Sequence, residues 1–335
     1  MKKISVWLLM LGVFTQQACA AEQVVNIYSY RQAYLIEPIL EKFTEQTGIK
    51  YNIVFAKSGI AERLKREGEF SPADIVLTTD GSRMVELAES GLTQAVTDKV
   101  LLDNIPEVYR DDENHWFALT LRVRNLFTQK DAFSGKKWRY EDLGTADFTG
   151  KICMRSGRHP YNVALIASII AHKGKEQAKQ WLQGVKSHLA RKPQGNDRAQ
   201  ISALESGLCD VAIANSYYYG KMLDNPEQRD IALAARINFP NTDDRGSHVN
   251  ASGVVMAKHA PNRDNALKLM RFLSQDTAQK MYAEVNMEYP VKAGVKPSDL
   301  LASWGMFRAD TLSLDALFNY RTDALKLLDE VKFDL

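Results

Sequence analysis

The chain has 335 residues, enough for about two domains, and its 45% hydrophobic and 25% charged content is that of a globular protein. This composition excludes a disordered tail, a collagen-like fibre and a disulfide-dense miniprotein. The formal net charge of +2, from 43 basic and 41 acidic residues, argues against a non-specific nucleic-acid binder, which normally carries a basic excess.

The N-terminus has the features of an export signal. Lys2 and Lys3 form a positive start, an apolar stretch covers 6–14, and a small-residue site predicts cleavage after about Ala20. The apolar stretch is much shorter than the ~20 residues that span a bilayer, and no later segment is long enough. We therefore expect a periplasmic protein without stable membrane insertion, whose formal charge falls from +2 to 0 on cleavage. Lipidation of Cys19 is the alternative, although the motif before it is poor.

Two cysteines, Cys153 and Cys209, are left after cleavage. A single pair in an oxidising compartment favours a disulfide, with two buried free thiols as the alternative. The cysteines are too few and too scattered for a zinc site, and the six histidines show no metal-binding spacing.

The first part of the mature chain alternates strands and helices. Runs of β-branched and aromatic residues predict strands, and apolar residues that recur on one face predict helices. The expected order is strand 24–30, helix 35–47, strand 51–56, helix 59–67, strand 73–79 and helix 82–90. This order predicts a parallel sheet with helices on both faces.

A second set of elements follows without a flexible linker. Strands are expected at 116–122, 151–154, 210–215 and 253–257, and helices at 161–172, 175–189, 199–207, 262–274 and about 309–331. We therefore predict two α/β domains joined by ordered crossing strands, with a hinge and a ligand cleft between them. The predicted lobes are 21–120 plus about 250–298, and 121–249 plus about 299–335.

Signals of an enzyme are missing from the sequence. It contains no G-x-S-x-G elbow, no P-loop and no H-E-x-x-H motif, and nothing pairs a nucleophile with a base. We therefore predict that the protein is not an enzyme. A periplasmic hydrolase is the weaker alternative, because no motif supports it.

Tyrosines gather where a ligand is expected. Tyr217, Tyr218 and Tyr219 directly follow the predicted strand 210–215, and Tyr161 stands at a predicted helix start. The carboxyl ends of strands are where open α/β sheets bind ligands. Fe(III) prefers anionic oxygen, and it can remove the proton from a phenol whose ordinary pKa is near ~10, so binding becomes pH-dependent.

Two arginines and the residues before a helix N-terminus predict an anion site near these tyrosines. Arg122 and Arg124 follow a predicted strand toward the same cleft, and Ser156 and Gly157 precede a helix N-terminus, which favours anions. Three phenolates balance a 3+ ion, and an anion held by these groups fills the remaining coordination positions.

Seven segments of the mature chain together resemble one family. The sequence resembles the periplasmic ferric-ion-binding proteins, the substrate-binding components of iron(III) ABC transporters, over essentially its whole mature length. The resembling segments are 26–50, 71–80, 115–124, 150–174, 189–200, 209–223 and 245–253. The combination is specific, whereas a pair of tyrosines alone is not.

The resemblance implies a type II bilobal periplasmic-binding-protein fold with iron in the cleft. The family's paired tyrosines match Tyr217 and Tyr218, and a further one matches Tyr161. Gln32 stands where many members have a histidine, which favours a three-tyrosine site with a synergistic anion, expected to be carbonate. Arg122 is the first choice for the anion, followed by Arg124. Further residues are expected to support the site or close over it: Arg31, Gln32, Tyr34 and Tyr219.

The expected partner is an inner-membrane ABC permease, which a monomeric closed form would dock on to deliver iron. The alternative within binding proteins is a small anion or an organic cation in the same cleft. Bound iron would separate these two functions, because an anion binder would carry no stoichiometric metal.

Overall fold

The computed structural model describes residues 23–335, so the predicted signal peptide lies outside the described residues. The strands are β1 Val24–Ser29, β2 Lys50–Phe55, β3 Ile75–Thr78, β4 Phe117–Gln129, β5 Ile152–Cys153, β6 Val211–Asn215, β7 Ala235–Asn238, β8 Val249–Met256 and β9 Tyr289–Pro290. The first seven helices are α1 Ala33–Thr47, α2 Ile60–Glu67, α3 Gly81–Glu89, α4 Lys99–Asn104, α5 Pro160–Lys173, α6 Lys175–Ser187 and α7 Asp197–Glu205. The others are α8 Ser216–Asp224, α9 Arg229–Leu233, α10 Arg263–Ser274, α11 Asp276–Val285, α12 Asp299–Ser303, α13 Leu314–Asn319 and α14 Arg321–Glu330. Within residues 23–335, no helix is long and apolar enough to cross a membrane.

The first part of the fold confirms the predicted parallel arrangement. β1 lies between β2 and β3 and pairs in parallel with both. Helix α1 buries the predicted apolar face, including Ile36, Ile39 and Phe43. It ends at Gly48, whose φ of 73° lies in the left-handed region that glycine adopts without strain.

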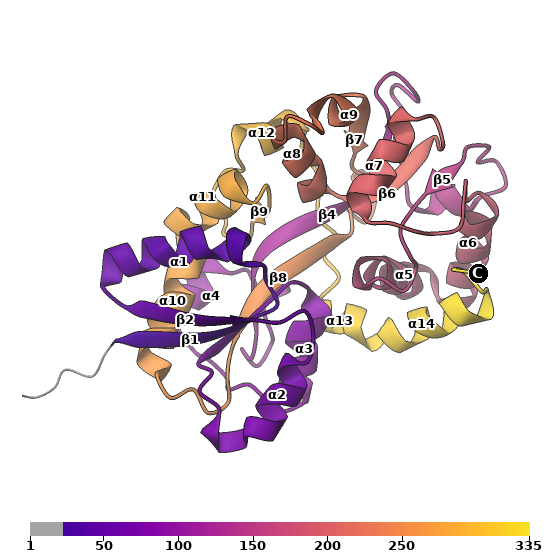
Figure 1. The fold of residues 1–335 in the computed structure, drawn as a ribbon. Helices are drawn as coiled ribbons and strands as arrows, with labels where there is room; N and C mark the ends of the chain where they lie inside the picture. Colours follow the sequence, from indigo (N-terminus) through magenta and orange to yellow (C-terminus); the bar gives the residue numbers. More distant parts are fainter. Residues whose placement is uncertain (1–22) are drawn as a thin grey trace, which may run out of the picture.

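Two long antiparallel strands join the halves of the molecule. The sheet order is β2-β1-β3-β8-β4-β6-β5, and β7 and β9 also pair with β4. The first half of β4 pairs with β8 and its second half with β6, so β4 runs from one group of elements into the other (Figure 1). This is the predicted bilobal architecture with crossing strands; the exact lobe boundaries stay a prediction.

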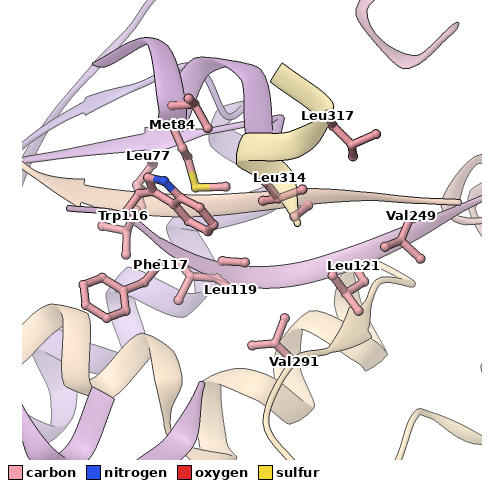
Figure 2. Packing of buried hydrophobic residues seen from close by; sticks show 14 of the residues in the cluster. Leu77, Met84, Trp116, Phe117, Leu119, Leu121, Val249, Val291, Leu314 and Leu317 are labelled. Atoms are coloured by element: carbon pink, nitrogen blue, oxygen red, sulfur yellow. The ribbon is translucent and has the colours of Figure 1, made fainter. Parts of the chain in front are cut away.

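Buried side chains from distant segments pack around β4 and β8. Three of them lie together in this core: Trp116, which precedes β4, Met84 of α3 and Leu314 of α13 (Figure 2). A Cβ at Gly253 would come within 2.3 Å of the Met84 sulfur and of the Phe117 carbonyl oxygen, so only glycine allows this close approach. Helix α13 thus joins the C-terminal segment to the packing around α3.

The C-terminal segment differs from the single helix predicted over about 309–331. It forms two helices, α13 and α14, and residues 309–313 are not helical. Ser313 begins α13, because its hydroxyl accepts a hydrogen bond from the Ala316 N–H at 3.2 Å. Asp310 lies before this cap and pairs with His172 and Arg245. These tertiary contacts fix an extended segment where the local pattern favours a helix.

The predicted disulfide between Cys153 and Cys209 is confirmed, with Cα atoms 5.8 Å apart. Cys153 ends β5, and Cys209 lies just before β6, which pairs in parallel with β5. Both cysteines belong to a second buried apolar cluster that also contains Phe127 and Leu204. The bond therefore fastens two neighbouring strands of the C-terminal half.

Candidate functional site

The three predicted tyrosine ligands lie on two helix N-termini. Tyr161 is in the first turn of α5, where Pro160 stands at a favourable position and His159 Nδ1 accepts a hydrogen bond from the Tyr161 N–H at 3.3 Å. Tyr217 and Tyr218 are in the first turn of α8, which begins directly after β6. Sequence reasoning placed these two residues after a strand but missed the helix.

Tyr161 and Tyr217 converge on Arg122 of β4, and Tyr218 packs against Tyr217. The Tyr217 and Tyr218 ring centroids are 4.1 Å apart. The Arg122 guanidinium carbon is 5.6 Å from the Tyr161 ring centroid and 5.8 Å from that of Tyr217. Tyr161 and Tyr217 are 8% and 9% exposed, and Tyr218 is partly exposed. The structure therefore brings together all three tyrosines and the first-choice arginine.

Burial makes two of the phenols harder to ionise. It raises the pKa of Tyr217 well above its ordinary value; the nearby Tyr161 and Tyr218 raise it further, and Arg122 lowers it. Burial also raises the pKa of Tyr218, with smaller increases from Tyr161 and Asp197. The metal-free site therefore holds Tyr217 and Tyr218 as phenols at neutral pH.

Arg122 lies between the tyrosines and the end of β3. One of its terminal nitrogens donates to the Thr79 carbonyl, while its buried Nε has no hydrogen-bond partner among the described residues. Burial by itself lowers the pKa of Arg122, but the neighbouring Tyr161, Glu288 and Tyr217 raise it overall. A cation is thus held at the boundary between the two halves.

Two further arginines border the site, and sequence reasoning did not assign them a role. The Arg155 guanidinium carbon is 5.8 Å from the Tyr161 ring centroid, and that of Arg198 is 5.8 Å from the Tyr218 ring centroid. Both residues lie in segments that carry the family resemblance, which was the only signal available for them. The site is therefore more basic than expected.

Arg124 is not placed as an anion-binding residue. It is fully buried and forms an ion pair with Asp197 at 2.6 Å, and it also donates to Asn162 and Asn215. Arg124 follows Arg122 by two residues, so it lies on the same face of β4 but further into the second half. Because acceptors within the protein already bind the terminal nitrogens of Arg124, these nitrogens are not directed at an anion in the tyrosine site.

Ser156 and Gly157 already bind a carboxylate of this chain, the side chain of Asp334. The Ser156 hydroxyl donates to Asp334 Oδ2 at 2.7 Å, and the Gly157 N–H donates to Asp334 Oδ1 at 2.8 Å. Phe333 packs so closely on Gly157 that a Cβ there would lie 2.8 Å from its ring. An anion does occupy the predicted site, but it is a carboxylate of this chain.

The residues predicted to surround the site have different environments. Arg31 is buried and bonded to Ser252 at 2.6 Å and to Glu288 at 2.7 Å, so it is held near the crossing strands. Gln32 begins α1 and is exposed, and Tyr34 is 58% exposed.

Tyr219 points into the second apolar cluster, unlike its two neighbours in the chain. Its ring packs on Phe127 and Trp304 with centroids 5.3 Å away in each case. Its hydroxyl donates to the Ala235 carbonyl at 3.3 Å. These contacts describe a packing residue.

Acidic and imidazole ligands do not gather elsewhere in the described chain. Within residues 23–335, no group of three or more His, Cys, Asp or Glu side chains could hold a metal ion.

Comparisons with known proteins agree on the kind of protein. Residues 39–309 match the family described as bacterial extracellular solute-binding protein. The chain is 40% identical to iron uptake protein A1 of Synechocystis over 92% of this chain and 87% of that protein.

Two solved structures extend this likeness to the fold. Ferric iron-binding protein A of Mannheimia haemolytica in an open conformation is 51% identical, with a TM-score of 0.89 over 93% of this chain and 99% of that one. The Trichodesmium protein solved with iron and citrate ligands is 36% identical, with a TM-score of 0.88 over 92% and 99%. The Synechocystis and Mannheimia proteins are named for iron, and the Trichodesmium protein was solved with iron bound. The chain belongs to the bacterial extracellular solute-binding proteins, and within them it is a periplasmic ferric-ion-binding protein of iron uptake.

Proposed function

We propose that the protein captures Fe(III) on the phenolate oxygens of Tyr161, Tyr217 and Tyr218, with a synergistic anion beside Arg122. The observation that carries this proposal is the convergence of Tyr161 and Tyr217, from two helix N-termini, on one buried arginine, with Tyr218 packed against Tyr217. Fe(III) is a hard cation, and three phenolates supply three anionic oxygens and balance its charge.

The charge for binding is created when the metal arrives. The mature protein as predicted is formally neutral, so it does not attract a 3+ ion by its overall field. Tyr217 and Tyr218 are neutral phenols in the free protein, and burial raises the pKa of both, so they lose their protons less readily. Iron replaces their protons, so the phenol oxygens carry negative charge only while they bind the metal. Acid therefore favours iron release.

The anion completes the site next to Arg122. A guanidinium offers paired N–H donors that match planar oxyanions such as carbonate. The unpaired Nε of Arg122 supports this role, because a buried donor without a partner is costly. Arg155 and Arg198 add positive charge around the tyrosines and favour the same kind of ligand.

Delivery of the metal uses the two-lobed architecture. β4 and β8 cross between the halves, so bending in these strands would close the N-terminal half over the tyrosines. We propose that the closed monomer docks on an ABC permease of the inner membrane, as solute-binding proteins of iron transport do. The export signal predicted to be cleaved after about Ala20 places the protein in the periplasm for this task.

The test is the colour and metal content of the protein after loading with Fe(III) and bicarbonate. Iron phenolates give a visible charge-transfer band, which we expect in the wild type and not in the Tyr217→Phe/Tyr218→Phe variant. Tyr289→Phe is the matched control, because it also removes a buried tyrosine hydroxyl, one that has no partner among the described residues. A colourless wild type without stoichiometric iron would refute the proposal and favour an anion or organic-cation binder.

A further inference from the structure

A buried polar cluster links the two helices that carry the proposed ligands. It consists of Arg124, Asn162, Asp197 and Asn215, and we refer to it as the Arg124 cluster. All four side chains are 0% exposed. Burying so many polar groups is costly unless each is well bonded, so the cluster needs a structural or functional reason.

One arm of the Arg124 cluster reaches the start of α5. Arg124 donates to Asn162 Oδ1 at 2.7 Å, and Asn162 directly follows Tyr161. The Asn162 amide also donates to the carbonyls of Arg155 and Ser156, at 3.0 Å each. Asn162 therefore fixes the loop on one side of Tyr161 to the first turn of the helix on the other.

A second arm reaches the start of α8. Arg124 donates to Asn215 Oδ1 at 3.1 Å, and Asp197 accepts the Asn215 N–H at 2.8 Å. Asn215 is the residue before α8, two positions before Tyr217. The arm therefore fixes where the helix begins, and with it the direction of its first two tyrosines.

Both arms start from Arg124, and Asp197 binds this arginine together with Arg155. Its carboxylate oxygens are 2.6 Å from Arg124 Nη1 and 3.1 Å from Arg155 Nη1. Arg155 in turn lies beside the Tyr161 ring. A metal needs its ligands within about 0.5 Å of the productive geometry, and that precision comes from the residues behind them.

We propose that Arg124 and Asp197 are positioning residues that hold Tyr161 in register with Tyr217 and Tyr218. The forked guanidinium is what makes this possible, because Arg124 bonds the α5 and α8 arms at once. A lysine at this position would keep the charge but could not span both arms. The inference rests on the proposed function, since it concerns the same three tyrosines.

The experiment compares Arg124→Lys and Asn162→Ala with Arg245→Lys. Arg245 is the matched control, since it is also a largely buried arginine of the C-terminal half, with two carboxylate partners, Glu141 and Asp310. Asn162→Ala keeps the ion pair between Arg124 and Asp197, so it provides the test should Arg124→Lys not fold. The readouts are the charge-transfer maximum, the Fe(III) affinity by chelator competition, and the Tm.

We expect both variants of the Arg124 cluster to shift the charge-transfer maximum and to weaken Fe(III) binding at least ~10-fold. Arg245→Lys should lower the Tm while it keeps the wild-type band and affinity. If Arg124→Lys or Asn162→Ala folds with the wild-type band and affinity, the positioning role is refuted. A wild type that shows no band instead overturns the proposed function, and the inference with it.

Discussion

The proposed ligand set predicts how steeply iron binding depends on pH. Each phenol that becomes a phenolate on binding releases one proton, so it contributes about a tenfold change in apparent affinity per pH unit. Tyr217 and Tyr218 begin as neutral phenols, and burial raises the pKa of both further above the neutral range. These two residues alone should weaken binding ~100-fold for each unit of acidification.

Replacing Tyr218 by Phe removes one of these protons. Acid should therefore weaken iron binding less in the variant than in the wild type, with a slope that is smaller by about one log unit per pH unit. Over about two pH units the difference reaches ~100-fold. The variant keeps Tyr161 and Tyr217, so its charge-transfer band still reports bound iron.

The measurement is a chelator competition read at the charge-transfer band, in identical buffers for both proteins. The protonation of the chelator, of the anion and of aqueous iron then cancels in the comparison. Tyr289→Phe should keep the wild-type slope. Equal slopes in wild type and Tyr218→Phe would show that Tyr218 loses no proton to the metal, and would remove it from the ligand set.

Three predictions concern stability. Burial lowers the pKa of His248 from 6.5 to about 3, so the free energy of unfolding decreases as the pH falls between these values. In urea unfolding, His248→Asn should reduce this dependence of the free energy on pH by about 1.4 kcal/mol per pH unit. Replacing Cys153 and Cys209 by Ala opens a loop with a sequence separation of 56 and should cost about 4 kcal/mol in the same assay. Asp334→Ala leaves the Ser156 hydroxyl and the Gly157 N–H without their acceptor and should cost about 1–3 kcal/mol.

Each of these predictions can be contradicted by a specific result. For Asp334→Ala the control is Asp103→Ala, which removes an exposed carboxylate paired with Lys99 and should change stability little. An equally small loss of stability in Asp334→Ala would contradict the role of the Asp334 side chain. An unchanged acid slope in His248→Asn would assign that slope to other groups. Free thiols in the denatured, unreduced wild type would exclude the disulfide in solution.

Local patterns predicted the elements of the first half well. α1 and the strands around it form where apolar residues recur with the right period and where Gly48 ends the helix. The pairing of the two cysteines also followed from their number and the expected compartment. The helix and the strands depend on neighbours in the chain, and the cysteine pairing depends on composition, both of which the sequence displays directly.

The length of β4 and the start of α8 could not be seen in the same way. β4 continues to Gln129 because β6 and β7 pair with its second half, and these strands come more than 80 residues later. α8 begins at Ser216 because the buried Asp197 and Arg124 hold Asn215. Such contacts join residues that are distant in the chain, so no local pattern contains them.

The site shows the same division. The sequence by itself determined which residue types are available, and the three tyrosines and Arg122 do converge. Only the tertiary structure gives Arg122 and Arg124 different surroundings, because two residues of strand advance the chain by about 6.6 Å and move the guanidinium from the tyrosines to a buried carboxylate. The tertiary structure also determines that the Gly157 N–H binds Asp334, 177 residues away, because only the fold brings the end of the chain to that loop.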